Sequence, residues 1–217
     1  MDKKFIIEEI EKNKLVAIIR GVPAEKLLPL AESLYAGGVR LLEVTYSANG
    51  SVSDGDTAGM IGALTTRFEG RMLIGAGTVL TREQVDLTKK AGGCFIISPN
   101  VDKEVIAETV ALSMVSIPGA LTPTEIVDAH KAGADFVKLF PITNLGTSYV
   151  KAIKAPLSHI KLLAVGGIDE NNMAEYLRAG VCGFGVGSNI TDKKLIENED
   201  YEGITALAKK YTEVLGQ

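Results

Sequence analysis

Short apolar segments alternate with amphipathic segments along most of the chain. The apolar segments have the length of buried strands and number eight: Leu15 to Ile19, Leu41 to Thr45, Arg71 to Ala76, Phe95 to Ser98, Met114 to Ile117, Phe136 to Phe140, Lys161 to Val165 and Gly183 to Val186. Between them the apolar residues recur with a helical period, as in Ala24 to Ala36, Arg82 to Ala91, Asp102 to Leu112 and Asn172 to Ala179. Parallel strands covered by helices are apolar throughout, so the pattern predicts an α/β fold with a parallel sheet.

A recurring Ala-Gly pair marks where the helical segments end. It occurs at Ala36-Gly37, Ala91-Gly92, Ala132-Gly133 and Ala179-Gly180, and an apolar run follows each time. Glycine just past a helix can take the left-handed conformation that releases the chain into the next strand. The pairs therefore support the division into strand–helix units.

Eight such units predict an α/β fold of the (β/α)8 TIM-barrel type, with one domain over residues 1–217 and a short N-terminal helix. A doubly wound open sheet is the alternative, because periodicity does not reveal whether a sheet closes. The one irregular stretch, Ser47 to Gly59, is rich in Ser, Gly, Asn and Asp and is expected to be a flexible loop. Its composition is compatible with a lid or with a plain surface loop.

Charge and composition exclude several classes of protein. The net charge of -4 argues against a nucleic-acid binder, which would carry a clustered basic surface. Only two histidines and two cysteines occur, and the cysteines lack metal-ligand spacing, so we expect no metal site. The N-terminus has no uninterrupted apolar signal segment, and no later apolar stretch is long enough to span a bilayer. We therefore expect a cytoplasmic protein that binds neither nucleic acid nor membrane.

Lys138 lies in the middle of the apolar run Phe136 to Phe140. Desolvation lowers the pKa of a lysine and so provides a neutral, nucleophilic amine near neutral pH. An enzyme that forms a Schiff base with a carbonyl substrate requires such a group. The alternative is a lysine whose ammonium reaches solvent at the end of the strand.

Polar groups follow the same pattern at other strand ends, where the catalytic groups of barrels gather. Glu43 is flanked by apolar residues, and burial would raise its pKa into the range of a general acid/base. Arg20, at the end of the first strand, could bind a carboxylate bidentately. The alternatives are a structural Glu43–Lys138 ion pair and a salt bridge of Arg20 at the barrel mouth.

The seventh and eighth strands end in glycines that suit a phosphate site, Gly166-Gly167 and Gly187-Ser188. Glycine lets backbone N–H groups approach an anion closely, although tight turns also require glycine. A lysine nucleophile, a carboxylate, an arginine and a phosphate site together suit reversible carbon–carbon cleavage of a phosphorylated 2-keto acid. The products would be pyruvate and glyceraldehyde 3-phosphate.

From about Leu15 to Asn189 the strand-end motifs resemble the 2-keto-3-deoxy-6-phosphogluconate / 4-hydroxy-2-oxoglutarate aldolase family of class I aldolase barrels. The motifs are Leu42-Glu43-Val44-Thr45, Ile74-Gly75-Ala76-Gly77-Thr78-Val79, Ser98-Pro99, Ile117-Pro118-Gly119, Val137-Lys138-Leu139-Phe140-Pro141, Val165-Gly166-Gly167-Ile168 and Gly187-Ser188.

The resemblance implies a role for each matching residue. Lys138 corresponds to the Schiff-base lysine and Glu43 to the general acid/base. Thr78 corresponds to a hydroxyl that holds the pyruvyl end, and Arg20 to the arginine after the first strand. The implied pocket walls are Pro99, Pro118 and Phe140, and the implied phosphate-binding residues are Gly166, Gly167, Gly187 and Ser188. The resemblance also implies a homotrimer without a cofactor.

Two departures from the gluconate-type members bear on substrate choice. Many of them have an arginine that binds the substrate carboxylate where this chain has Ser47. We therefore expect Arg20, Thr78 and backbone amides to bind that carboxylate here. They often have Pro-Thr where this chain has Ala164-Val165, and Asn100 and this pair are more similar to the 6-phosphogalactonate branch. Both sugar epimers, and 4-hydroxy-2-oxoglutarate, remain candidate substrates.

Two other functions fit parts of the pattern. A phosphate-binding barrel isomerase or epimerase shares the glycines after the last two strands but does not need a buried lysine on the sixth. A non-catalytic sensor of sugar phosphates would bind a ligand without turnover, and Glu43 would then serve only as the partner of Lys138.

Overall fold

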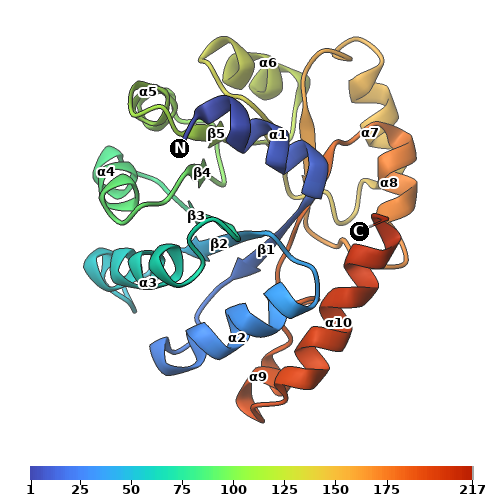
Figure 1. The fold of residues 1–217 in the computed structure, drawn as a ribbon. Coiled ribbons are helices and arrows are strands. Elements are labelled where there is room, and N and C mark those ends of the chain that lie inside the picture. The colour runs from blue at the N-terminus through green and yellow to red at the C-terminus, as the bar shows by residue number, and fades with distance from the viewer. Residues whose placement is uncertain (217) are drawn as a thin grey trace.

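The structure, a computed structural model, describes residues 1–216 and consists of a parallel sheet inside a ring of helices (Figure 1). The strands are β1 Leu15–Ile19, β2 Leu41–Thr45, β3 Leu73–Gly77, β4 Phe95–Ile97, β5 Val115–Ile117, β6 Gly119–Ala120, β7 Val137–Leu139, β8 Leu162–Val165 and β9 Gly183–Val186. Their order in the sheet is β5-β4-β3-β2-β1-β9-β8-β7-β6.

The sheet closes on itself through Pro118. The strands at the two ends of the sheet order, β5 and β6, are separated along the chain by this single residue. The Ile117 carbonyl accepts from the Ser98 N–H on one side at 3.3 Å, and the Pro118 carbonyl accepts from the Lys138 N–H on the other at 2.8 Å. Proline has no N–H to donate, so the strand is divided in two where it bridges its neighbours. The predicted TIM barrel is confirmed, and the open sheet is excluded.

The helices cover the outside of the barrel. Their bounds are α1 Lys3–Asn13, α2 Ala24–Ala36, α3 Asp54–Arg67, α4 Arg82–Lys90, α5 Lys103–Ala111, α6 Pro123–Lys131, α7 Gly146–Lys154, α8 Met173–Ala179, α9 Lys193–Glu197 and α10 Tyr201–Val214. The last helix packs beside α2, where the Thr212 hydroxyl donates to the Gly37 carbonyl at 2.8 Å. Within residues 1–216, no helix combines the length and the apolar character that a membrane crossing requires.

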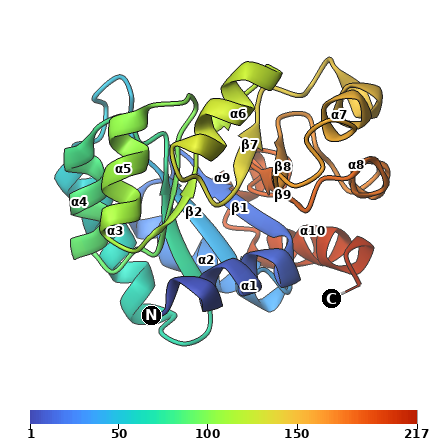
Figure 2. The ribbon, with the colours of Figure 1, turned by 90° about the horizontal axis from the view of Figure 1, so that it is seen from above.

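Helix α1 lies across the N-terminal end of the barrel, as the view from above in Figure 2 shows. Its buried residues Ile6 and Ile10 lie on one helix face and join the interior cluster of strand residues. That cluster contains Val16, Leu41, Leu73, Phe95, Ile97, Val115, Ile117, Phe136 and Leu163. With this end of the barrel filled by apolar side chains, polar groups enter the interior at the other end.

The sequence-based boundaries agree closely with the structure. Strands β1, β2 and β9 begin and end as predicted, and the other predicted strands differ by one or two residues at one or both ends. In three of the four Ala-Gly pairs the glycine has a left-handed backbone, with positive φ at Gly92, Gly133 and Gly180. In the first pair Gly37 has a φ of -79°, and the next residue, Gly38, takes the left-handed conformation instead. The helix-ending role inferred from the Ala-Gly pairs is therefore confirmed for three pairs and shifted by one residue in the first.

The prediction of a flexible loop over Ser47 to Gly59 was wrong in its second half, because α3 begins at Asp54. Ser53 is the N-cap: its hydroxyl accepts from the Asp56 N–H at 3.0 Å and donates to the Asp56 carboxylate at 2.7 Å. Acidic residues in the first turn also interact favourably with the helix dipole. These terms outweigh the low helix propensity of Gly55 and Gly59, so the irregular loop spans only residues 46–53.

We predict that Gly75→Ala destabilises the fold by roughly 1–3 kcal/mol, because the added methyl group would overlap the fully buried Phe95 ring. The matched control is Gly59→Ala in α3, where a methyl group meets nothing within 4 Å. This change should stabilise the fold by roughly 0.5–1 kcal/mol. Urea unfolding measures both, and equal stability of the two variants would contradict the packing of Phe95 against β3.

Candidate active site

Lys138 and Glu43 share the interior of the barrel. Side chains alternate between the two faces of a strand. Leu42 and Val44 belong to the cluster between sheet and helices, so Glu43 faces inward from β2. By the same argument Lys138 faces inward from β7, since its neighbours Val137 and Leu139 pack outward. Both side chains are buried, with 5% of Lys138 and 1% of Glu43 exposed.

The surroundings of Lys138 favour a neutral amine. Burial lowers the pKa of Lys138, the Glu43 carboxylate partly raises it again, and Arg20 lowers it. No ion pair within 4 Å joins Lys138 to a carboxylate in the described part of the chain. The nitrogen Nζ lies 4.5 Å from the centroid of the Phe140 ring, the position of a cation–π contact when the amine is charged. The structure thus shows neither the solvent-exposed lysine nor the direct Glu43–Lys138 salt bridge that the sequence left open.

Glu43 is a carboxyl group with one unused oxygen. Burial raises the pKa of Glu43, while Lys138, Arg20 and a hydrogen bond from Thr45 lower it. The Thr45 hydroxyl donates to Oε1 at 3.5 Å, and the buried Oε2 has no hydrogen-bond partner among the described residues. Burial favours the protonated form of the Glu43 carboxyl group, so the group can donate a proton as well as accept one.

Gly77 provides the space that the Glu43 carboxyl group occupies. A methyl group built on Gly77 would overlap the carboxyl group of Glu43. Gly77 belongs to β3, which pairs with β2, so the strand beside the carboxylate must lack a side chain at this position. In the sequence Gly77 stands out only as part of the motif Ile74 to Val79, because nothing in the local pattern reveals what a glycine faces.

Arg20 and Thr78, two of the predicted substrate-binding residues, meet at the barrel mouth. Nη2 of Arg20 donates to Oγ1 of Thr78 at 3.3 Å. Thr78 has a φ of 53°, which is rare for a β-branched residue. Such strained backbones persist where the surroundings enforce them, and they cluster at functional sites.

The predicted phosphate-binding glycines form two neighbouring turns. Gly166 and Gly167 have φ of 100° and 69°. The side-chain amide of Asn172 donates a hydrogen bond to the Gly167 carbonyl at 2.8 Å. The Asn189 amide, from the segment after β9, donates to the Ile168 carbonyl at 3.0 Å and so joins the two turns. Ser188 is exposed, and its hydroxyl has no partner among the described residues.

The other predicted residues line separate cavities around the mouth, except Pro118. Pro99 and Phe140 line one cavity of about 380 Å³, together with Asn100. Gly187 and Ser188 line another of about 470 Å³, which also contains Arg20 and Lys26. Pro118 lies in the barrel wall between β5 and β6, where it bridges the two ends of the sheet.

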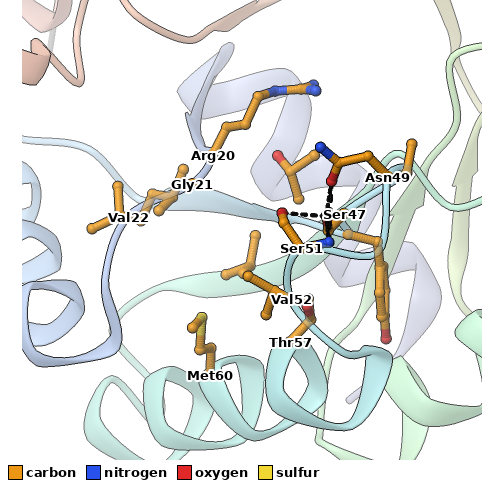
Figure 3. A pocket seen from close by; sticks show the side chains of 14 residues that line it. Arg20, Gly21, Val22, Ser47, Asn49, Ser51, Val52, Thr57 and Met60 are labelled. Carbon is orange, nitrogen blue, oxygen red and sulfur yellow. Dashed lines mark hydrogen bonds between the residues drawn. The ribbon is translucent and has the colours of Figure 1, made fainter.

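A further cavity of about 380 Å³ lies beside Arg20, between the loops that follow β1 and β2 (Figure 3). Its lining includes Thr45, Ser47, Asn49 and Ser51. The sequence did not single out Thr45 and Asn49 as site residues. Thr45 had a signal, since it follows Glu43 by two residues and therefore faces the same side of the strand. Asn49 had none beyond its place in the loop.

We predict that the pKa of Lys138 lies below the ordinary lysine value of about 10.4 and falls further in Glu43→Gln, because the substitution removes the carboxylate that raises it. Competitive labelling with acetic anhydride at a series of pH values, read out at Lys138 by mass spectrometry, measures this. Lys193, whose side chain is 87% exposed, is the internal reference for reagent decay. An upward shift in Glu43→Gln would contradict the assigned charge interaction.

Known proteins resemble this chain over nearly its whole length. The 2-dehydro-3-deoxy-6-phosphogalactonate aldolase of Escherichia coli (strain K12) is 34% identical over 205 residues, covering 94% of this chain and 97% of that protein. The 2-dehydro-3-deoxy-phosphogluconate aldolase of Treponema pallidum (strain Nichols) is 33% identical, covering 97% and 98%.

Solved structures agree with the sequence comparison. A native KDPGal structure matches with a TM-score of 0.83 at 33% identity, covering 93% of both chains. The KDPG aldolase of Legionella pneumophila, with pyruvate captured as a covalent carbinolamine, matches with a TM-score of 0.84 at 30% identity, covering 96% and 97%. The family model described as KDPG and KHG aldolase matches residues 6–207. The chain therefore belongs to the KDPG and KHG aldolase family.

Proposed function

We propose that this chain is a class I aldolase that cleaves a 2-keto-3-deoxy-6-phosphosugar acid into pyruvate and glyceraldehyde 3-phosphate. The observation that carries the proposal is the buried Lys138, with its lowered pKa, in the same barrel interior as the Glu43 carboxyl group. The Legionella pneumophila relative, which holds pyruvate as a covalent carbinolamine, supports the same chemistry.

Lys138 and Glu43 divide the covalent and proton-transfer steps. Neutral Nζ attacks the C2 carbonyl to give a carbinolamine, and loss of water leaves an iminium. Glu43 donates a proton to the departing water and then, as a carboxylate, accepts the proton of the C4 hydroxyl. The C3–C4 bond breaks, its electrons pass into the iminium to form an enamine, and glyceraldehyde 3-phosphate leaves. Protonation at C3 and hydrolysis of the imine release pyruvate and restore the lysine.

The other predicted residues bind and orient the substrate. Arg20 and Thr78 hold the pyruvyl end, beside the reacting lysine. Pro99, Pro118 and Phe140 form the walls, and the phosphate lies against Gly166, Gly167, Gly187 and Ser188. The backbone N–H groups of Gly167 and Ser188 have no acceptor among the described residues, which supports an anion site there.

The galactonate-type epimer is the proposed preferred substrate. Val165 lies two residues after the interior residue Leu163 and so faces the barrel interior at the end of β8. A valine offers no hydrogen bond to a sugar hydroxyl, unlike the threonine common in gluconate-type members. The 2-dehydro-3-deoxy-6-phosphogalactonate aldolase of Escherichia coli and a Rhizobium meliloti protein named as a "probable" one, each 34% identical to this chain, support this choice.

The competing functions fit less well. An isomerase or epimerase uses the phosphate site but gives no reason to bury a lysine beside a carboxyl group. A sensor gives no reason for the unused carboxyl oxygen of Glu43. The homotrimer stays a prediction, and light scattering after size-exclusion chromatography measures the subunit number.

We predict that the protein releases glyceraldehyde 3-phosphate from both phosphorylated epimers, with a higher kcat/KM for the galactonate type. Lys138→Ala should lose roughly 10³-fold or more of this activity, because no other group replaces the nucleophile. The matched control is Lys4→Ala, since the Lys4 side chain is 82% exposed. A dehydrogenase-coupled assay of the released aldehyde measures all three proteins.

Three outcomes would contradict parts of the proposal. Full activity in a folded Lys138→Ala protein would remove the Schiff base. Absence of cleavage of either epimer by the wild type would remove the proposed reaction. A higher kcat/KM for the gluconate epimer would overturn only the assignment that rests on Val165.

A further inference from the structure

The side-chain amide of Asn49 has a defined orientation in the loop between β2 and α3. Its oxygen Oδ1 accepts from the Ser47 hydroxyl at 2.7 Å and from the Ser51 backbone N–H at 3.1 Å. A backbone N–H can only donate, so the atom that faces it must be the amide oxygen. The amide nitrogen Nδ2 therefore points away from the loop, with two N–H groups to donate.

Asn49 and Arg20 face one another as two donors. Figure 3 shows the amide nitrogen of Asn49 turned toward the guanidinium group of Arg20 at the cavity described above. Nδ2 donates to no group in residues 1–216, and Arg20 makes one side-chain hydrogen bond there, to Thr78. No carboxylate within 4 Å pairs with Arg20 in the same residues. Both residues are exposed to solvent, and an anion that enters the cavity would meet two donors and no neighbouring carboxylate.

One edge of the cavity adjoins the Glu43 carboxyl group through Thr45. Thr45 lines it, and the Thr45 hydroxyl donates to the carboxyl group of Glu43 at 3.5 Å. Arg20, at the same cavity, interacts electrostatically with both Glu43 and Lys138. Thr45 and Arg20 thus connect this cavity to the two reacting groups.

We propose that Asn49 is a specificity-determining residue whose amide, together with the guanidinium group of Arg20, binds the carboxylate of the 2-keto acid. The inference rests on the proposed aldolase function and goes beyond it by assigning the carboxylate to the loop over residues 46–53. The hydrogen bonds among Ser47, Asn49 and Ser51 hold this loop in place before the ligand arrives. Less conformational freedom is then lost on binding.

The test compares a charged with a neutral ligand in three proteins: wild type, Asn49→Asp and Asn49→Ala. Asn49→Asp keeps the oxygen that the loop requires and places a negative charge opposite Arg20. Pyruvate and its uncharged methyl ester are each trapped on the protein with borohydride, and the half-saturating concentration is measured. For pyruvate it should rise roughly 10-fold or more in Asn49→Asp and by a smaller factor in Asn49→Ala. For methyl pyruvate it should change less than twofold, which a loop that had simply lost its structure would not allow.

Three results would overturn the proposal. Equal changes for pyruvate and methyl pyruvate would make Asn49 a purely structural residue. Unchanged values for pyruvate would show that Asn49 does not contact the carboxylate. A change confined to the KM for glyceraldehyde 3-phosphate, measured in the aldol direction, would place the phosphate at Asn49.

Calorimetric titration of the same three proteins with pyruvate, without borohydride, separates this proposal from the proposed function. If the wild type binds pyruvate but gives no trapped adduct, the Schiff-base function fails. The difference in affinity between the wild type and the Asn49 variants then still decides the role of Asn49.

Discussion

Two ionisable side chains, Lys138 and Glu43, are buried in the interior of one barrel without an ion pair within 4 Å between them. Burial disfavours the charged form of each, so it lowers the pKa of the lysine and raises that of the glutamate. Both shifts favour what imine chemistry requires, a neutral amine and a carboxyl group that exchanges protons. Desolvation of these groups lowers the free energy of unfolding, and interactions elsewhere in the fold must offset this cost.

The barrel meets this constraint by separating its two ends. Apolar side chains and helix α1 fill the N-terminal end, which excludes water below the reacting groups. At the other end Gly77 has no side chain, and the Glu43 carboxyl group occupies the space that a side chain there would fill. One hydrogen bond joins Arg20 and Thr78 at this end of the barrel. The left-handed backbone of Thr78 indicates that local strain is tolerated there.

Much of the fold could be predicted because its signals are local. Continuous apolar runs and the glycines after helices place strands and helix ends, as Gly38 and Gly180 show. The loop prediction was wrong from Asp54 onward. It rested on the Ser, Gly, Asn and Asp content of the segment, although the spacing of Ser53 and Asp56 is itself a pattern that starts helices. The candidate site was found through residues whose chemistry conflicts with an apolar strand, above all Lys138. Gly77 and Asn49 act through what they face in space, and no local pattern carries that information.

The account stands on a covalent bond between Lys138 and a keto acid. The most direct test is peptide-resolved mass spectrometry after incubation with pyruvate and borohydride, with Lys138→Ala treated in parallel. The account predicts a reduced pyruvyl adduct on Lys138 and none in the variant. An adduct on another lysine, or no adduct at saturating pyruvate, would contradict it.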